Sequence, residues 1–419
     1  MPEIRAQRLA SIALFVFAVV RYWHPFDPRA TDPGWFESLN VAKSLTQAGD
    51  WANPFQTAAT GPTAHLAPVF PLVISLLGRD KPSDPVLAHR LNVFETLSVA
   101  LAIALLPTVA EAAGMNFMAG LVAGAAITIV PSGMAPQWES HFAALELALL
   151  TLVCLHWWKN AKQLRWAVLA GAAWGITVLT FTNALLAFAV FLALGIMVRA
   201  PWRALAACCS VSVILVAPWT VRNVSVLGGF VPIRSNLGLE LHVSNNECAA
   251  ASFTSNLQTS CFRAMHPNES LAEAGRLKFM GELAYYGDHR RAALHWISSN
   301  PGRFAKLTFE RFLLFWFPRD GPSGWNDASK TGGGLFAVAA GAMTLLSIPG
   351  WVMLRRTSRF SAIWFGVWLA CFPLVHYLVQ FDFRYRYPVL WMSYLLGAHA
   401  LVELGVWHGR HDGKQSGRV

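Results

Sequence analysis

Charged residues are scarce in this chain of 419 residues, where Asp, Glu, Lys and Arg together make up 13%. A typical soluble domain contains about 25% charged residues. Hydrophobic residues account for 55% of the sequence, and the mean hydropathy is +0.41. This balance excludes an ordinary soluble enzyme. It also excludes a disordered chain, which requires few apolar residues and a high net charge.

Cysteines and clustered metal ligands are scarce as well. The chain has 6 cysteines and 13 histidines, but neither a CxxC nor an HxxxH pattern occurs among them. Such patterns are the usual sequence sign of a metal site, so the sequence predicts neither a metal nor an organic cofactor. Four cysteines lie in apolar runs, where cysteine packs as a small apolar residue: Cys154, Cys208, Cys209 and Cys371.

Long apolar runs separated by charged turns make up most of the chain. Ten runs are candidates for membrane-spanning helices, although several fall short of the ~20 residues that a crossing needs. They cover residues 9–23, 86–106, 117–134, 142–157, 166–180, 185–198, 204–219, 335–354, 363–378 and 389–406. No small-residue cleavage site follows the first run, so we interpret it as a retained helix rather than a signal peptide. These runs predict an all-α polytopic membrane protein with about ten transmembrane helices and helical outer loops.

The basic residues set the orientation of these spans. The formal net charge of +10 would suggest a nucleic-acid partner in a soluble protein, but in a membrane protein it indicates cytoplasmic loops. With ten spans and a cytoplasmic N-terminus, five basic groups fall on the cytoplasmic side: Arg5 and Arg8; Lys159, Lys162 and Arg165; Arg199 and Arg203; Arg355, Arg356 and Arg359; Arg410, Lys414 and Arg418. We therefore expect an integral inner (plasma) membrane protein with both termini cytoplasmic, its functional site on the outer face and no nucleic-acid partner.

Three parts follow from this topology. Residues 1–220 form an N-terminal transmembrane module whose first outer loop is 24–85, residues 221–334 form an outer segment, and residues 335–419 form the last helices and a cytoplasmic tail. Within the first loop, the run 66–78 is only ~13 residues long and contains two prolines, which favours a re-entrant or interfacial helix. The outer segment has helix-like apolar spacing at 267–286, 289–299 and 304–317. Cys248 and Cys261 lie together in that segment, where an oxidising exterior permits a disulfide; the alternative is two unpaired thiols.

The first outer loop carries an acidic residue at the start of a predicted surface helix. Trp35, Leu39, Ala42 and Leu45 share one helical face, as in an amphipathic helix lying on a membrane surface. Asp32 precedes this face and is followed by proline, an arrangement typical of a helix N-cap. Two interpretations are therefore open for Asp32: a structural cap or a functional acid.

The order of motifs resembles a known family. After the acidic residue come AGDW and GPTAHLAPVFPL, then PWTVRN closing the seventh span, SNLGLELHVSNN in the outer segment and FRYRYP before the last span. This order is similar to that of the GT-C type polyprenyl-phosphate-sugar-dependent glycosyltransferases, which include protein O-mannosyltransferases and the lipid A aminoarabinose transferase. That family carries an Asp-Glu pair in its first outer loop. Asp32 occupies the first position, but Pro33 stands at the second, and Glu37 lies on another face of the predicted helix.

The resemblance implies an inverting hexosyl- or pentosyltransferase. It would move a sugar from a polyprenyl-phosphate donor in the membrane to a lipid, glycan or protein acceptor on the outer face. Asp32 would act as general base, and cationic groups would stabilise the departing lipid phosphate. The candidates for binding donor phosphate or substrate are His65, Arg222, Arg384, Tyr385 and Arg386. Arg222 could instead be an interfacial arginine that reaches lipid headgroups, and His65 a hydrogen-bonding residue of the loop.

Two other functional classes remain open. Ionisable residues inside a membrane are functional hypotheses by default. The chain has Arg90 and Glu95, whose five-residue spacing allows only an imperfect pair, as well as Glu139, His141 and Glu146. A transporter or flippase of a lipid-linked substrate would use such groups, but inverted repeats are not apparent in the sequence. A non-catalytic membrane scaffold would follow if Pro33 marks a lost active site. The acidic first loop and the large outer segment favour the enzyme.

Overall fold

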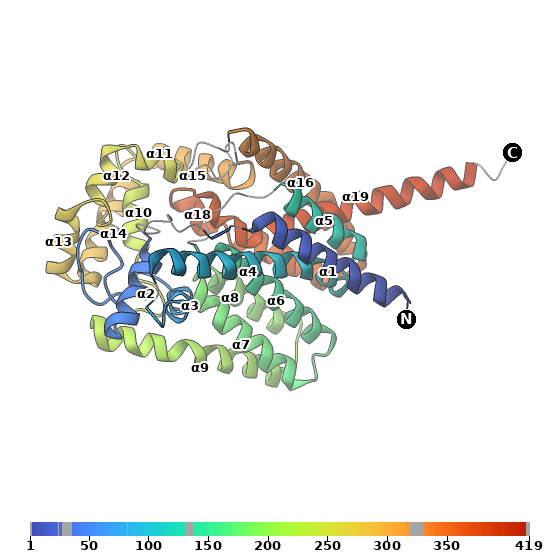
Figure 1. Ribbon diagram of the computed structural model, residues 1–419, viewed down its shortest axis with the longest axis horizontal. Coiled ribbons are helices and arrows are strands. Elements are labelled where there is room, and N and C mark those ends of the chain that lie inside the picture. The colour runs from blue at the N-terminus through green and yellow to red at the C-terminus, as the bar shows by residue number, and fades with distance from the viewer. Residues whose placement is uncertain are drawn as a thin grey trace.

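The computed structural model describes residues 2–23, 25–26, 36–81, 83–130, 138–318 and 330–415. Regular structure in these ranges is helical, and β pairing is limited to isolated bridges such as the one between Ser252 and Phe381. Helices α10 to α14 gather at one end of the molecule, and the start of α1 and the end of α19 lie at the opposite end (Figure 1). Both chain ends therefore lie on the side away from the outer segment.

Every predicted span overlaps a helix of the structure. The helices are α1 (Pro2–Tyr22), α4 (Asp84–Ala113), α5 (Phe117–Ile129), α6 (Ser140–Lys159), α7 (Leu164–Thr180), α8 (Ala184–Met197), α9 (Trp202–Leu227), α16 (Lys330–Thr357), α17 (Arg359–Cys371), α18 (Leu374–Leu378) and α19 (Tyr387–Gln415). Among the described residues, five helical segments are long and apolar enough to cross a membrane: Asp84–Ala113, Ser140–Lys159, Trp202–Leu227, Gly334–Thr357 and Arg359–Leu378. The prediction of an all-α polytopic membrane protein is confirmed.

Two helix boundaries differ from the expected ones. The ninth span is interrupted, since α17 ends at Cys371 and Pro373 caps the short α18; proline lacks the N–H that would continue the helix. The seventh span is longer than expected, because α9 continues to Leu227. The predicted domain boundary at residue 220 therefore falls inside a helix.

Close helix packing depends on small residues. A Cβ atom added to Gly350 of α16 would lie 1.9 Å from the Leu396 carbonyl oxygen of α19, and one added to Gly171 of α7 would lie 2.4 Å from the Cys208 carbonyl oxygen of α9. Such contacts let helix backbones approach closely, as is common in membrane bundles. Large apolar side chains on the outside, such as Ile214 and Ile348, are more than half exposed, as expected where lipid surrounds the protein.

Between α9 and α16, the described part of the outer segment contains six helices: α10 (Leu237–Ser244), α11 (Phe253–Leu257), α12 (Ser260–Met265), α13 (Leu271–Met280), α14 (Glu282–Ser299) and α15 (Pro301–Trp316). The sequence places a break near residue 288, and this prediction is wrong, because the chain breaks at Gly281 instead. Gly281 has φ +80°, which glycine adopts at little cost. Gly287 continues α14 with ordinary helical geometry.

The outer segment is fixed to the end of the ninth span. Arg311 of α15 is fully buried and donates hydrogen bonds to Asn245 Oδ1 (3.1 Å), the Leu378 carbonyl (2.9 Å) and the Ser244 carbonyl. The backbone of Phe381 exchanges hydrogen bonds with Ala251 and Phe253. These contacts hold the 379–386 connection, which carries Arg384, against α10 and α11.

Cys248 and Cys261, which flank α11, are paired as a disulfide in the structure. Their Cα atoms lie 6.2 Å apart, within the range that a disulfide spans. The pairing closes a loop of the outer segment.

The first outer loop contributes two surface helices, α2 (Glu37–Ala48) and α3 (Val69–Leu77). Leu39 and Ala42 of α2 pack against Phe70 and Ile74 of α3 and against the start of α4, so these two residues of the predicted apolar face are buried. At nine residues, α3 is too short to cross a bilayer. The residue preceding α2 is Phe36, so the expectation that this helix begins directly after Asp32 is wrong.

Candidate functional site

The first outer loop is held in place by an arginine at the outer end of α9. Arg222 donates from Nη1 to the Thr63 carbonyl (2.7 Å) and from Nη2 to the Trp51 carbonyl (2.7 Å). Its guanidinium also lies 5.0 Å from the centroid of the Trp219 ring. These contacts give Arg222 a structural role in the loop, and phosphate binding by this residue stays a prediction.

A buried glutamate at the start of α14 completes the anchor. Glu282 accepts hydrogen bonds from the Ala64 backbone N–H (2.8 Å), the Ser235 hydroxyl (2.6 Å) and the Thr63 hydroxyl. The Arg234 Nε donates to the carbonyl of His65 at 3.0 Å. Segments that lie far apart in the chain are thus joined on the outer side of the bundle. We call this group of residues, 63–65, Arg234, Ser235 and Glu282, the outer floor.

His65 lies within this floor and is almost fully buried. Its Nδ1 is 2.7 Å from the Tyr286 hydroxyl, and the Phe55 ring packs edge-on against it. Burial lowers the pKa of His65 well below its usual value, and the charges of Arg234 and His266 act in the same direction. The imidazole is therefore neutral at physiological pH and can exchange one hydrogen bond with the tyrosine.

Two acids and two arginines from three parts of the chain come together beside this floor; we call Glu37, Arg234, Glu240 and Arg384 the polar cluster. Burial raises the pKa of Glu37 to about 7, while Arg384 and Arg234 lower it and Glu240 raises it. Burial also raises the pKa of Glu240, against the opposing effect of the same two arginines. A carboxyl group with a pKa near neutrality can take up and release a proton under physiological conditions.

Arg384 is the member of the polar cluster with unused hydrogen-bond donors. Its guanidinium lies 3.4 Å from the centroid of the Trp138 ring, and its Nη2 donates to the Tyr385 hydroxyl at 3.1 Å. Asp382 provides a longer ion pair, 3.7 Å from Nε. Within the described part of the chain, the buried Nε and Nη1 atoms have no hydrogen-bond partner. Buried donors are rarely left unsatisfied, so this guanidinium is suited to an anionic ligand.

Arg386, two residues further on, has different surroundings. It is fully buried and donates from Nη1 to the Trp316 carbonyl (2.8 Å) and from Nη2 to the Thr344 hydroxyl. These contacts lie at the junction of α15, α16 and α19, and not with the polar cluster. His65, Arg384 and Tyr385 therefore lie at or beside the outer floor, whereas Arg386 contacts Trp316 and Thr344 instead. Phosphate binding by Arg386 stays a prediction.

The predicted catalytic acid Asp32 and its neighbour Pro33 lie outside the described residues. Glu37, five positions later, is the acidic residue that sequence reasoning set aside. The available signal was the acidic residue of the SNLGLE motif, Glu240, since Glu240 and Glu37 lie near the same arginine. Which acidic residues meet could be found only from the fold.

The ionisable residues inside the bundle are paired. Glu95 lies 3.0 Å from His141 Nδ1, and Glu146 accepts a hydrogen bond from the Thr180 hydroxyl at 2.9 Å. Arg90 pairs with Asp80, with 2.8 Å between Nη2 and Oδ2, so the suggested pairing of Arg90 with Glu95 is wrong. The described residues contain no group of three or more His, Cys, Asp or Glu side chains that could hold a metal ion.

Solved structures with a similar fold exist, although no protein-family model and no curated protein sequence matches the chain. An oligosaccharyltransferase from Archaeoglobus fulgidus, solved in complex with Zn and sulfate, is 15% identical with a TM-score of 0.56; the match covers 96% of this chain and 50% of that protein. Its apo form gives a TM-score of 0.54 at 15% identity, with coverages of 96% and 52%. ArnT from Cupriavidus metallidurans, bound to undecaprenyl phosphate, is 14% identical with a TM-score of 0.40, with coverages of 96% and 78%.

The likeness to the oligosaccharyltransferase shows the fold. The chain has the same helical membrane architecture as that protein, and the predicted resemblance to GT-C glycosyltransferases is confirmed at the level of the fold. The chain spans about half the length of the oligosaccharyltransferase that it matches.

Proposed function

We propose that this protein is a membrane glycosyltransferase that moves a sugar from a polyprenyl-phosphate donor to an acceptor on the outer face, with inversion at the anomeric carbon. The GT-C fold supports the reaction class. The observation that carries the proposal is Arg384, a half-buried arginine beside two acids, whose buried Nε and Nη1 atoms have no hydrogen-bond partner among the described residues. The fold and this cluster together fit an anionic leaving group and a proton acceptor.

The leaving group is bound by Arg384. When the acceptor oxygen attacks the anomeric carbon, the bond between that carbon and the phosphate oxygen breaks and the lipid phosphate gains negative charge. The Arg384 guanidinium stabilises this charge, and its planar fork matches phosphate oxygens. Tyr385 orients the guanidinium through its hydroxyl, and His65 holds the neighbouring loop through Tyr286.

The acceptor proton passes to a carboxylate. Asp32 is the proposed general base, because it occupies the acidic position of the resembling family. Glu37 is a second acid within the same loop, and its pKa of about 7 suits proton transfer near neutral pH. In this scheme Glu37 tunes the charge next to Arg384, and Asp32 takes the proton.

The experiment measures sugar transfer by the purified full chain in lipid nanodiscs. Synthetic polyprenyl-phosphate sugars are the donors, and a membrane extract supplies the acceptors; release of polyprenyl phosphate is followed as well. Arg384→Ala and Arg384→Lys test the phosphate site, and Arg290→Ala is the matched control, since Arg290 is an exposed arginine of the same outer segment. We expect transfer by the control and a large loss in both Arg384 variants, since lysine keeps the charge but not the fork.

A stable wild-type protein that releases no lipid phosphate from any donor would contradict the proposal. Donor binding unchanged in Arg384→Ala would contradict the assigned phosphate site. Transport of intact donor across the membrane without sugar transfer would favour the flippase.

A further inference from the structure

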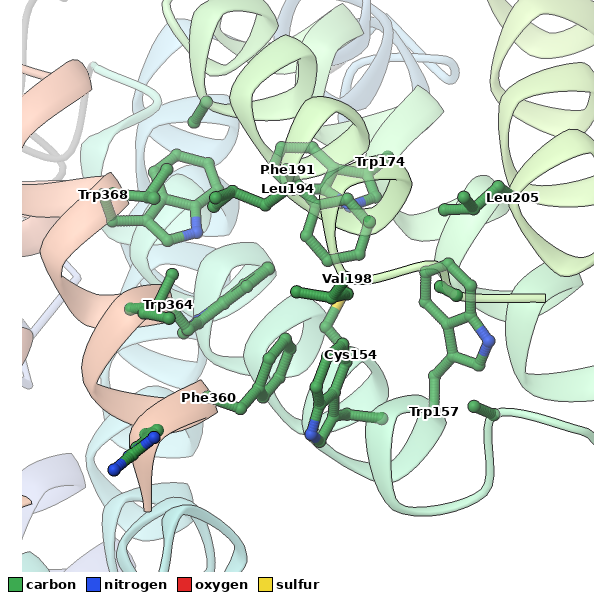
Figure 2. A pocket seen from close by; sticks show the side chains of 18 of the residues that line it. Cys154, Trp157, Trp174, Phe191, Leu194, Val198, Leu205, Phe360, Trp364 and Trp368 are labelled. Atoms are coloured by element: carbon green, nitrogen blue, oxygen red, sulfur yellow. The ribbon is translucent and has the colours of Figure 1, made fainter. Parts of the chain in front are cut away.

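A second site lies at the other end of the helix bundle. A cavity of about 250 Å³ is enclosed by α6, α7, α8, the start of α9 and α17, and Figure 2 shows Trp174, Phe191, Phe360, Trp364 and Trp368 around it. The mouth of this aromatic cavity is formed by the C-terminal end of α6, the α8–α9 turn and the start of α17, and its inner wall includes Trp174 of α7, Phe191 of α8 and Trp368 of α17. None of them belongs to the outer segment or to the first outer loop.

The distance from the polar cluster follows from α9. Leu205 near the start of this helix lines the aromatic cavity, and Arg222 near its other end contacts the outer floor. The rise of an α-helix over the residues between them is about 26 Å, so the two sites are separate. By the predicted topology, the cavity lies in the cytoplasmic leaflet.

The walls of the aromatic cavity are apolar and rigid. The Trp158 and Phe360 rings stack with centroids 4.0 Å apart, and Trp174 stacks on Trp368 at 5.3 Å. A cavity without polar partners does not hold ordered water, and engineered apolar cavities of about 150 Å³ stay dry and bind apolar ligands. The aromatic cavity is larger, so a flexible hydrocarbon chain is the ligand that its walls fit.

The mouth of the cavity is basic. Arg359 is one of the lining residues and is exposed, and no acidic side chain within the described ranges pairs with it. Arg199 lies between the lining residues Val198 and Ala200, and Lys159 follows the lining residue Trp158. The segments 155–166, 197–207 and 353–363 contain no Asp or Glu, so the mouth attracts a negatively charged headgroup.

We propose that the aromatic cavity binds an anionic phospholipid of this leaflet, with one acyl chain inserted among the tryptophans and the headgroup phosphate on Arg359. The apolar walls fit an acyl chain. The basic mouth, which lacks acidic partners, favours an anionic over a zwitterionic headgroup, since basic residues near a membrane surface attract anionic lipids. The inference does not depend on the glycosyltransferase function of the outer site.

The test compares two lipids with the same acyl chains. The purified full chain in detergent is titrated with phosphatidylglycerol and with phosphatidylcholine, and bound lipid is counted by native mass spectrometry. We expect phosphatidylglycerol to be retained more tightly. Arg359→Ala weakens that retention about fivefold, as loss of one basic contact near the surface predicts, and brings it closer to that of phosphatidylcholine. Arg165→Ala is the charge control, because Arg165 lies on the same side but does not line the cavity.

A second variant tests the acyl-chain site. Val198 lines the mouth and is 53% exposed, so Val198→Trp fills the entrance without burying a larger side chain in the core. We expect it to abolish retention of both lipids, whereas Ile214→Trp on the lipid-facing surface of α9 leaves retention unchanged. Equal retention of the two lipids by the wild type, or unchanged retention in Arg359→Ala and Val198→Trp, would overturn the proposal. Displacement of phosphatidylglycerol by polyprenyl phosphate at equal concentration would assign the cavity to the donor chain instead and would also overturn it.

Discussion

The polar cluster lies on the outer side of the helix bundle and the aromatic cavity lies among α6, α7, α8, α9 and α17, and the two sites differ in their physical character. At the outer end, half-buried charges are placed against one another, and desolvation raises the pKa of both acids. At the other end, aromatic rings enclose an apolar space and the charges remain exposed at the mouth. The difference teaches that a buried charge suits a reaction, where charge develops, whereas an exposed charge beside an apolar space suits retention of a lipid.

The largest expected effect is at the outer end, in Asp32→Asn. Asparagine has nearly the same size and shape as aspartate, and α2 begins at Glu37 after Phe36, so the loss of a helix cap is not expected and stability should be nearly unchanged. Asparagine cannot, however, accept a proton. We expect transfer to fall about 10²–10⁴-fold, the usual contribution of a general base, with lipid retention at the aromatic cavity unaffected. Transfer rates and melting temperatures measured on the same preparation check this. Full transfer activity in a stable Asp32→Asn protein would leave Asp32 without a catalytic role.

The next effect separates Arg384 from Arg386. Arg384→Ala should reduce transfer about 10²–10³-fold, as removal of a charge-stabilising donor does, with little loss of stability. Arg386→Ala should instead destabilise the fold by about 1–3 kcal/mol, because it leaves the buried Trp316 carbonyl and Thr344 hydroxyl without this partner. Chemical unfolding and transfer assays of both variants provide the comparison. Equal losses of stability in the two variants would argue against distinct roles.

Removal of the disulfide tests whether the outer segment can be destabilised without affecting the aromatic cavity. In the loop-entropy model, the Cys248–Cys261 bridge stabilises the protein by about 3 kcal/mol. The double variant Cys248→Ala/Cys261→Ala should lose stability and transfer activity while retaining phosphatidylglycerol at the aromatic cavity. Thiol alkylation under denaturing, non-reducing conditions measures the pairing directly. Labelling of both cysteines without reductant would contradict the bridge.

The smallest expected effect is a pH dependence at Glu37. Burial raises the pKa of Glu37 to about 7, so the folded protein binds this proton more tightly than the unfolded chain does. Its contribution to stability is complete below the ordinary pKa of a glutamate and is lost as the pH rises through about 7. Glu37→Gln should therefore gain stability relative to the wild type between pH 5 and pH 8. The difference in melting temperature between Glu37→Gln and the wild type is measured at pH 5 and at pH 8. Glu310→Gln is the control, because the Glu310 side chain on α15 is 40% exposed. The same difference at both pH values would contradict the raised pKa of Glu37.

The helical topology could be predicted from the sequence because it depends on local properties. Apolar runs long enough for a membrane, and basic turns between them, are read residue by residue, and every predicted span overlaps a helix. The break between α13 and α14 was misplaced because the backbone conformation of a glycine is not readable from the sequence. Gly281 adopts φ +80° and ends the helix, while Gly287 does not have a positive φ. Both are glycines in similar surroundings, and the packing of α13 and α14 selects one of them.

The candidate site was only partly predictable. His65, Arg384 and Tyr385 stand in motifs that suggested a role, and they do lie on the outer floor or beside it. Glu37 was set aside because helical periodicity gives the face of a residue on its own helix, but not what the fold brings against that face. The aromatic cavity was not foreseen, because its tryptophans lie on separate apolar runs that each look like an ordinary transmembrane helix.

The sequence by itself determined that this is an all-α membrane protein with a folded outer segment, since hydrophobicity and charge along the chain decide how it is threaded through a bilayer. The tertiary structure alone decided the fate of Arg384 and Arg386, which stand two residues apart in FRYRYP with equal claims from the sequence. Arg386 meets Trp316 and Thr344, 70 and 42 positions away, and both of its Nη atoms donate to them. Arg384 lies on the Trp138 ring with two donors unused, because long-range contacts determine which buried charge already has partners and which is left for a ligand.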